Sequence, residues 1–89
     1  MTEVIWSERL TFIHDPGHGW LKVPMTEIDA LGIRKDISPY SYSIMGFAYL
    51  EEDMDYGTYM KARQEQGIPD PIITSQYVDY FDRNRASFR

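Results

Sequence analysis

The chain has 89 residues, no cysteine and a formal net charge of −5. A chain of this length forms a single domain (residues 1–89), and the lack of cysteine excludes disulfide bonds and thiolate chemistry. The negative charge argues against binding nucleic acid through phosphate neutralisation and favours a protein partner with a basic surface. No apolar run approaches the ~20 residues of a membrane span, so we expect a soluble, cytoplasmic protein without membrane contact.

The N-terminal part of the sequence predicts a β-hairpin. Residues 4–14 are rich in β-branched and aromatic side chains, and their later part alternates as a strand does. Residues 19–23 also alternate, so the two stretches are typical of two strands. Between them, Asp15-Pro16-Gly17 supplies turn chemistry, with Gly17 expected to adopt the positive φ of a type II turn. We expect Trp20 to close one end of the core between sheet and helix.

Two further elements are expected in the middle of the chain. Thr26 is placed to cap a short helix that extends to Leu31, and Gly32 ends it in the left-handed conformation. Residues 38–44 then alternate with period two, which predicts a strand, and residues 45–46 form a tight turn into a partner strand over residues 47–50.

The last elements complete an α+β domain. Asp53 or Asp55 is expected to N-cap the longest helix, over residues 54–66, and Gly67 ends that helix. A final strand follows over residues 72–78. The order of elements predicts a small, mainly antiparallel sheet of about four to five strands with two helices packed on one face.

The opening turn contains both histidines of the chain, and they suggest a metal site. His14, Asp15 and His18 offer imidazole and carboxylate ligands, but a zinc site requires about four ligands, and the chain has no cysteine and no third histidine. We therefore expect an ordinary hairpin turn that binds no metal and no cofactor.

Four carboxylates are clustered within five positions: Glu51, Glu52, Asp53 and Asp55. Acidic residues collect at a helix N-terminus because they interact favourably with the helix dipole, so the cluster has a structural explanation. It also predicts an acidic patch that binds arginine or lysine side chains of a partner protein. A general acid-base pair is not favoured, because the helix dipole already explains the cluster. A calcium loop is not favoured, because the spacing lacks the ladder of oxygen ligands that calcium needs.

Aromatic residues on the central strands allow a different function. Single-stranded nucleic acid stacks on such side chains when basic residues surround them. The residues involved would be Tyr40, Tyr42, Phe47 and Tyr49, with Arg83, Arg85 and Arg89 contacting phosphates. The charges near the tyrosines are acidic, so we keep this function as the alternative.

No catalytic motif is present in the sequence. It contains no Gly-x-Ser-x-Gly elbow and no glycine-rich phosphate loop before a helix, and no spacing pairs a serine with a histidine. We therefore expect a protein that is not an enzyme. The edge strands and the tyrosines also allow a homodimer.

Three stretches together resemble a group of small phage- and prophage-encoded proteins: "DPGHGWLKVP", "YSYS" and "AYLEEDMDYGTYMKA". These proteins carry an Asp-Pro-Gly-His-Gly-Trp turn, a Tyr-Ser-Tyr strand and a Leu-Glu-Glu-Asp helix start in the same order, and the likeness covers residues 15–62. The group has no established activity, so the resemblance implies no residue role. Met54 stands where such sequences often have a cysteine, which argues against a thiol-based function.

Size, charge and this resemblance lead to one expected function. We expect a small acidic protein of a phage or mobile element that binds a host protein through its acidic surface. An inhibitor of a host defence protein, of the anti-CRISPR kind, fits this description, because nucleases have basic grooves. A domain of this size can present about 800 Å² to a partner but has little room for a deep catalytic pocket.

Overall fold

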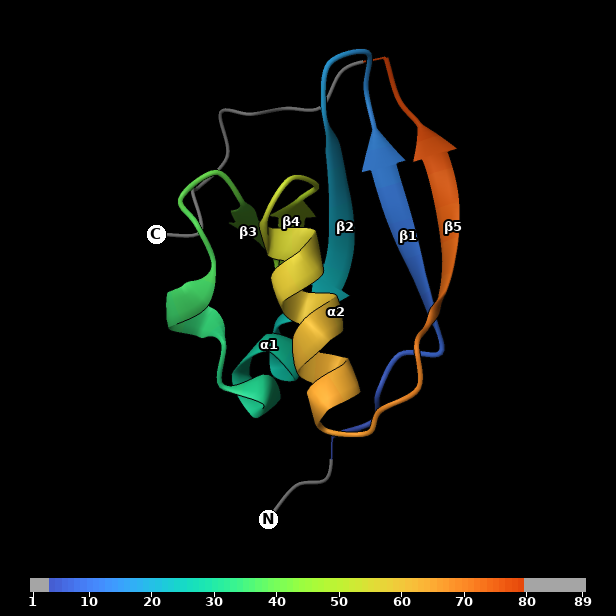
Figure 1. Cartoon of the computed structure of the whole chain (residues 1–89). Coiled ribbons are helices and arrows are strands. Elements are labelled where there is room, and N and C mark those ends of the chain that lie inside the picture. The colour runs from blue at the N-terminus through green and yellow to red at the C-terminus, as the bar shows by residue number, and fades with distance from the viewer. Residues whose placement is uncertain (1–3, 80–89) are drawn as a thin grey trace.

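A mixed β-sheet forms the back layer of the protein in Figure 1. The computed structural model describes residues 4–79, and within this range the sheet has five strands in the order β3-β4-β2-β1-β5. Neighbouring strands are antiparallel except β5, which runs parallel to β1. The strands are β1 (Arg9–His14), β2 (Gly19–Pro24), β3 (Tyr42–Ile44), β4 (Phe47–Glu51) and β5 (Ile72–Tyr77).

Two helices lie in front of this sheet in Figure 1. Helix α1 (Met25–Leu31) contacts β2 and β4, and helix α2 (Asp55–Glu65) contacts β4 and α1. A 3-10 turn, η1 (Arg34–Asp36), connects α1 to the segment before β3. The described residues thus confirm the predicted fold class, an α+β domain with a mainly antiparallel sheet and two helices.

The core lies between the helices and the central strands. Alternation along β2 and β4 sends every second side chain toward the helices, and Leu21, Val23 and Leu50 are fully buried there. Ile28 of α1 and Tyr59 of α2 meet them from the other layer. Burial of such apolar side chains contributes about 1.5 to 3 kcal/mol each, so this contact surface holds the two layers together.

The structure confirms the predicted glycine ends and the central turn. Gly32 and Gly67 follow α1 and α2 with φ of 71° and 74°, which is the left-handed conformation that glycine adopts most easily. Met45 and Gly46 both have positive φ in the turn between β3 and β4. That geometry matches a tight hairpin turn.

Three predicted boundaries are wrong. The first strand begins at Arg9 rather than at residue 4, and α1 begins at Met25, so Pro24 occupies the N-cap and Thr26 lies inside the helix. The strand predicted from residue 38 begins only at Tyr42. Ser38 instead donates its backbone N–H and its hydroxyl to the carboxylate of Asp55, and these bonds hold the segment out of the sheet.

Candidate functional site

A cavity of about 420 Å³ lies where the turn of the first hairpin meets the start of α2. It is lined by residues 17–20, by Tyr40 and Tyr42, and by residues 51–54. The cavity therefore brings together the two sequence motifs that carried the functional expectations, the histidine-containing turn and the acidic cluster. Its lining includes both aromatic rings and carboxylates.

Asp15 builds the turn that forms one wall of the cavity. Its Oδ1 accepts hydrogen bonds from the backbone N–H of Gly17 at 3.0 Å and of His18 at 2.9 Å. The expected type II turn is wrong, because Gly17 has no positive φ; the aspartate side chain organises the turn instead. Gly19 also has negative φ, and it is needed because a Cβ there would overlap the ring of Phe12.

Trp20 lines the cavity next to this turn. Its side chain is 2% exposed, and its ring stacks on His18 with centroids 5.8 Å apart and lies 6.3 Å from the ring of Tyr42. Trp20 precedes Leu21, which faces the helices, so Trp20 points to the opposite face of the sheet. The expectation that Trp20 packs between sheet and helix is therefore wrong, although the residue is buried.

Glu51 has a structural role at the rim of the cavity. Its side chain accepts hydrogen bonds from the backbone N–H groups of Asp53 at 2.9 Å, Met54 at 2.6 Å and Asp55 at 3.3 Å. These N–H groups belong to the two residues before α2 and to its first residue, where the helix itself supplies no acceptor. Met54 occupies the N-cap, so the predicted capping by Asp53 or Asp55 is wrong, and Glu51 performs that function from outside the helix.

The acidic cluster divides into two parts in the folded protein. Glu52 and Asp53 are exposed at the cavity, beside Glu51. Asp55 is 1% exposed and accepts hydrogen bonds from the backbone and hydroxyl of Ser38 and from the hydroxyl of Ser41. The structure thus brings three of the four predicted partner-binding residues together at the surface and places the fourth inside.

The two histidines belong to different clusters. His14 lies next to Phe12 and Tyr77, with ring centroids 6.1 and 5.5 Å apart, whereas His18 stacks on Trp20. Across residues 4–79, no group of three or more histidine, aspartate or glutamate side chains is arranged to hold a metal ion. The hairpin therefore gives the histidines aromatic neighbours rather than a shared ligand position.

The tyrosines proposed for base stacking lie partly together. Tyr42 and Tyr49 are cross-strand neighbours on β3 and β4, on the same face as Trp20, and Tyr40 is 72% exposed in the segment before β3. Phe47 lies on this face too, with the ammonium group of Lys22 4.3 Å from its ring centroid. The arginines proposed for phosphate contact, Arg83, Arg85 and Arg89, lie outside the described residues.

A buried polar cluster joins the two helices, and sequence reasoning missed it. Glu27 of α1 and Arg63 of α2 are 0% and 2% exposed, with Oε1 and Nη1 3.5 Å apart. The hydroxyl of Tyr59 lies between them, donating to Glu27 at 2.6 Å and accepting from Arg63 at 2.9 Å. Burial and the neighbouring Glu27 carboxylate raise the pKa of Tyr59 well above its ordinary value of 10.0, against a smaller lowering effect of Arg63.

Arg63 also ties distant backbone segments to this cluster. Its guanidinium donates to the carbonyl oxygens of Ser7 at 3.1 Å and Pro69 at 2.7 Å, while Ser7 donates its own N–H and hydroxyl to Glu27. No local sequence pattern indicates this cluster, because Glu27 and Arg63 are 36 positions apart. Glu27, Tyr59 and Arg63 all bond to one another or to backbone, so the cluster supports the fold. Within residues 4–79, Nε of Arg63 is buried without a hydrogen-bond partner.

No protein-family model, curated protein or solved structure matches this chain. Within the described range, no helix is both long enough and apolar enough to cross a membrane.

Proposed function

We propose that the protein is a small acidic binding module without enzymatic activity, and that Glu52 and Asp53 contact a basic surface of its protein partner. One observation carries this proposal: two exposed carboxylates border a cavity of about 420 Å³ that also exposes an aromatic ring, that of Tyr40. An arginine or lysine side chain gains from both, through charge pairing and through contact with the ring face.

The remaining acidic residues support this surface rather than form it. Glu51 holds the backbone of residues 53–55, and Asp55 fixes the segment that carries Tyr40 through Ser38. The formal charge of −5 adds a long-range attraction for a basic partner. An origin in a phage or another mobile element, and inhibition of a host defence protein of the anti-CRISPR kind, rest on the sequence resemblance alone.

Affinity capture from a bacterial host lysate, followed by identification of the bound protein, tests the proposal. We expect a captured protein whose binding weakens as salt rises, because exposed charges are screened over about 10 Å at 0.1 M salt. The double variant Glu52→Lys, Asp53→Lys should lose the capture. Its matched control is Asp36→Lys, Glu65→Lys, which changes the net charge equally at two other exposed positions and should retain it.

Two results would overturn the acidic contact: capture that survives the Glu52 and Asp53 reversal, or equal loss in both double variants. Glu51 and Asp55 are excluded from the charge reversals because both make hydrogen bonds that stabilise the fold. A variant at either position would confuse loss of binding with loss of structure.

The alternative, binding of single-stranded nucleic acid, draws support from the cross-strand pair Tyr42 and Tyr49. Glu51 lies on the same face of the sheet as these tyrosines, as the cross-strand neighbour of Trp20. An acidic group therefore lies beside the proposed stacking surface. We expect a labelled single-stranded oligonucleotide to show no shift in fluorescence anisotropy, even at low salt where phosphate contacts are strongest. A salt-sensitive shift that is lost in Tyr42→Ala would favour the alternative function.

A further inference from the structure

Among residues 4–79, the outer edge of β5 has no strand partner. The N–H of Ile72 donates to the carbonyl of Glu8, and that of Val78 donates to the carbonyl of His14, both at 2.8 Å. Backbone groups alternate in direction along a strand, so the even-numbered residues of β5 direct their N–H and C=O groups toward β1. Ile73, Ser75 and Tyr77 direct theirs outward. Among the strands of residues 4–79, β5 pairs only with β1 and ends the sheet.

This edge lacks the features that usually prevent strand addition. Native edge strands are protected by charged residues, proline, bulges or short length. Residues 72–78 contain no charge and no proline, and the register with β1 continues without interruption over six pairs. The opposite edge strand, β3, has only three residues.

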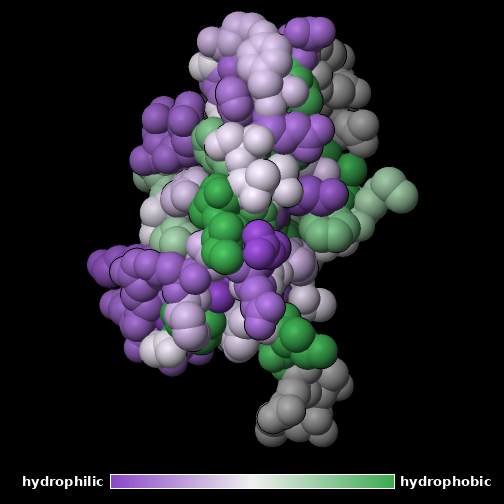
Figure 2. Space-filling model, turned by 90° about the vertical axis from the view of Figure 1, so that its right-hand side faces the viewer, coloured by the Kyte–Doolittle hydropathy of each residue, from purple (hydrophilic) through white to green (hydrophobic). Residues whose placement is uncertain are grey.

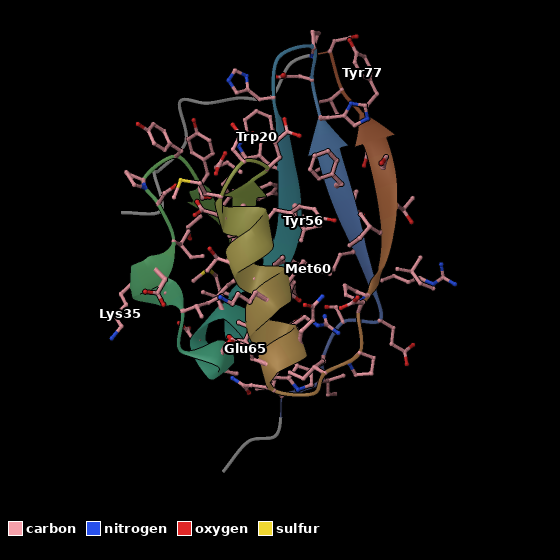
Figure 3. The ribbon with its side chains drawn as sticks, in the orientation of Figure 1. Trp20, Lys35, Tyr56, Met60, Glu65 and Tyr77 are labelled. Carbon is pink, nitrogen blue, oxygen red and sulfur yellow. The ribbon has the colours of Figure 1, made fainter. Side chains whose placement is uncertain are left out.

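The β5 edge also exposes apolar side chains. Ile72 is 55% exposed and Tyr77 is 56% exposed. Figure 2 views the protein from the β5 side and shows hydrophobic atoms near the middle of this face, with weakly polar atoms above them. Figure 3 shows Tyr77 at the far end of β5, beyond the part of the sheet that the helices cover.

The sequence of this strand is symmetric in hydropathy about its centre. Ile72 and Ile73 precede the polar residues 74–76, and Tyr77 and Val78 follow them. We propose that β5 pairs in antiparallel fashion with β5 of a second copy of this chain, across a twofold axis at Ser75. Two sheets then become one continuous sheet through an interface in which both copies use the same residues.

The twofold axis at Ser75 fixes the register. Ser75 faces its own counterpart, and Ile73 faces Tyr77 of the second copy, so all outward N–H and C=O groups of these three residues are paired in about six hydrogen bonds. On the opposite face, Ile72 lies across from Val78. Apolar residues thus meet apolar residues on both faces, and no like charges are opposed.

This self-complementarity favours a second copy over an unrelated peptide. An arbitrary strand satisfies the backbone groups equally well, but an antiparallel copy also matches the apolar ends and the polar centre of β5. Cross-strand pairs between aromatic and β-branched side chains, such as Tyr77 with Ile73, stabilise a sheet by about 0.2 to 1 kcal/mol each. The symmetric arrangement forms each such pair twice.

Sedimentation and light scattering over a range of protein concentrations test the proposal. We expect the mass to rise from that of one chain, 10.5 kDa, to twice that value. Ser75→Lys places two like charges on the axis and should raise the dimer dissociation constant at least about 10-fold. The control, Gln66→Lys, adds the same charge at the exposed end of α2 and should leave the constant unchanged.

Amide hydrogen exchange of the wild-type chain gives a second measurement that does not depend on a variant folding. The N–H groups of Ile73, Ser75 and Tyr77 should become protected as the dimer forms. A chain that stays monomeric at millimolar concentration overturns the proposal. A dimer in which these three amides exchange freely also overturns it, because the copies then meet elsewhere. Protection of the three amides that appears only when another protein is added overturns it too, because the partner is then not a second copy.

Discussion

The hydroxyl of Tyr59 donates a 2.6 Å hydrogen bond to Oε1 of Glu27, a residue 32 positions away in the sequence. Both side chains are fully buried, and the same hydroxyl accepts a hydrogen bond from Arg63. Helices α1 and α2 are therefore joined by a charged and hydrogen-bonded cluster as well as by apolar packing. Loss of either charged partner, Glu27 or Arg63, should destabilise the fold strongly, because the remaining buried charge stays uncompensated.

Tyr59→Phe tests the contribution of this hydroxyl. The substitution keeps the ring and removes both hydrogen bonds, so we expect the free energy of unfolding to fall by about 1 to 3 kcal/mol. Urea unfolding at neutral pH measures the change. Tyr56→Phe is the control, because the Tyr56 ring packs edge-on against Phe12. Figure 3 shows Tyr56 at α2, and we expect the free energy of unfolding of this variant to change by less than about 0.5 kcal/mol. Equal effects in the two variants would contradict a specific role for the buried hydroxyl.

The pKa of Tyr59 makes this contribution depend on pH. Its pKa is raised in the folded protein above the ordinary value of 10.0, so folding favours the protonated form. The resulting stabilisation is fully present below pH 10.0 and is lost as the pH rises toward the folded-state pKa. We expect the difference in free energy of unfolding between the wild type and Tyr59→Phe to be constant below pH 10.0 and to shrink above pH 10.0. A difference that grows with alkaline pH would mean that the folded state favours the ionised tyrosine.

Substitution of Asp55 should reduce stability much more than substitution of Asp53, although the two residues are only two positions apart. Asp55→Ala removes the acceptor for the backbone and hydroxyl of Ser38, and we expect the free energy of unfolding to fall by about 2 to 4 kcal/mol. Asp53→Ala changes an exposed side chain and should alter stability by less than about 0.5 kcal/mol. Thermal or urea unfolding measures both. If Asp55→Ala keeps its stability and loses the captured partner, Asp55 is a contact residue after all.

Local patterns predicted most of the elements. Alternation in residues 38–50 and the positive φ that glycine tolerates located the β3–β4 hairpin and the ends of both helices. The start of β3 was missed because Ser38 bonds to Asp55, and no local pattern contains a contact between residues 17 positions apart. The parallel pairing of β5 with β1 was missed for the same reason, since alternation indicates a strand but not its direction.

The sequence identifies several residues of the candidate site but not how the fold arranges them at the surface. The acidic cluster was recognised from composition, and capping was assigned to the nearest aspartates, whereas Glu51 reaches the N–H groups from the preceding strand. Alternation places Trp20 and Leu21 on opposite faces but does not say which face the helices cover. Sequence patterns assign no role to Glu27, because its partners, Tyr59 and Arg63, come from a helix that is distant in sequence.

Trp20→Ala should be much more damaging than His18→Ala. Trp20 is 2% exposed, so its removal leaves a large cavity and should lower the free energy of unfolding by about 3 to 5 kcal/mol. His18 is exposed and stacks on the tryptophan, and its loss should cost less than about 1 kcal/mol. Thermal melts of the two variants measure the difference. A stable, folded His18→Ala protein that has lost its partner would instead assign His18 to the binding surface.

Gly19→Ala tests why glycine is required at the start of β2. Its φ is negative, so backbone conformation does not demand glycine, but an added methyl group would overlap the ring of Phe12. We expect Gly19→Ala to lower the free energy of unfolding by about 1 to 3 kcal/mol, as overpacking does. Gly17→Ala is the matched control, because the nearest atom to its added Cβ is Oδ1 of Asp15 at 4.0 Å. In the double variant Phe12→Leu, Gly19→Ala, the smaller side chain should relieve the overlap, so the loss should be less than the sum of the two single losses. Strictly additive losses would show that the ring of Phe12 is not what excludes a side chain at position 19.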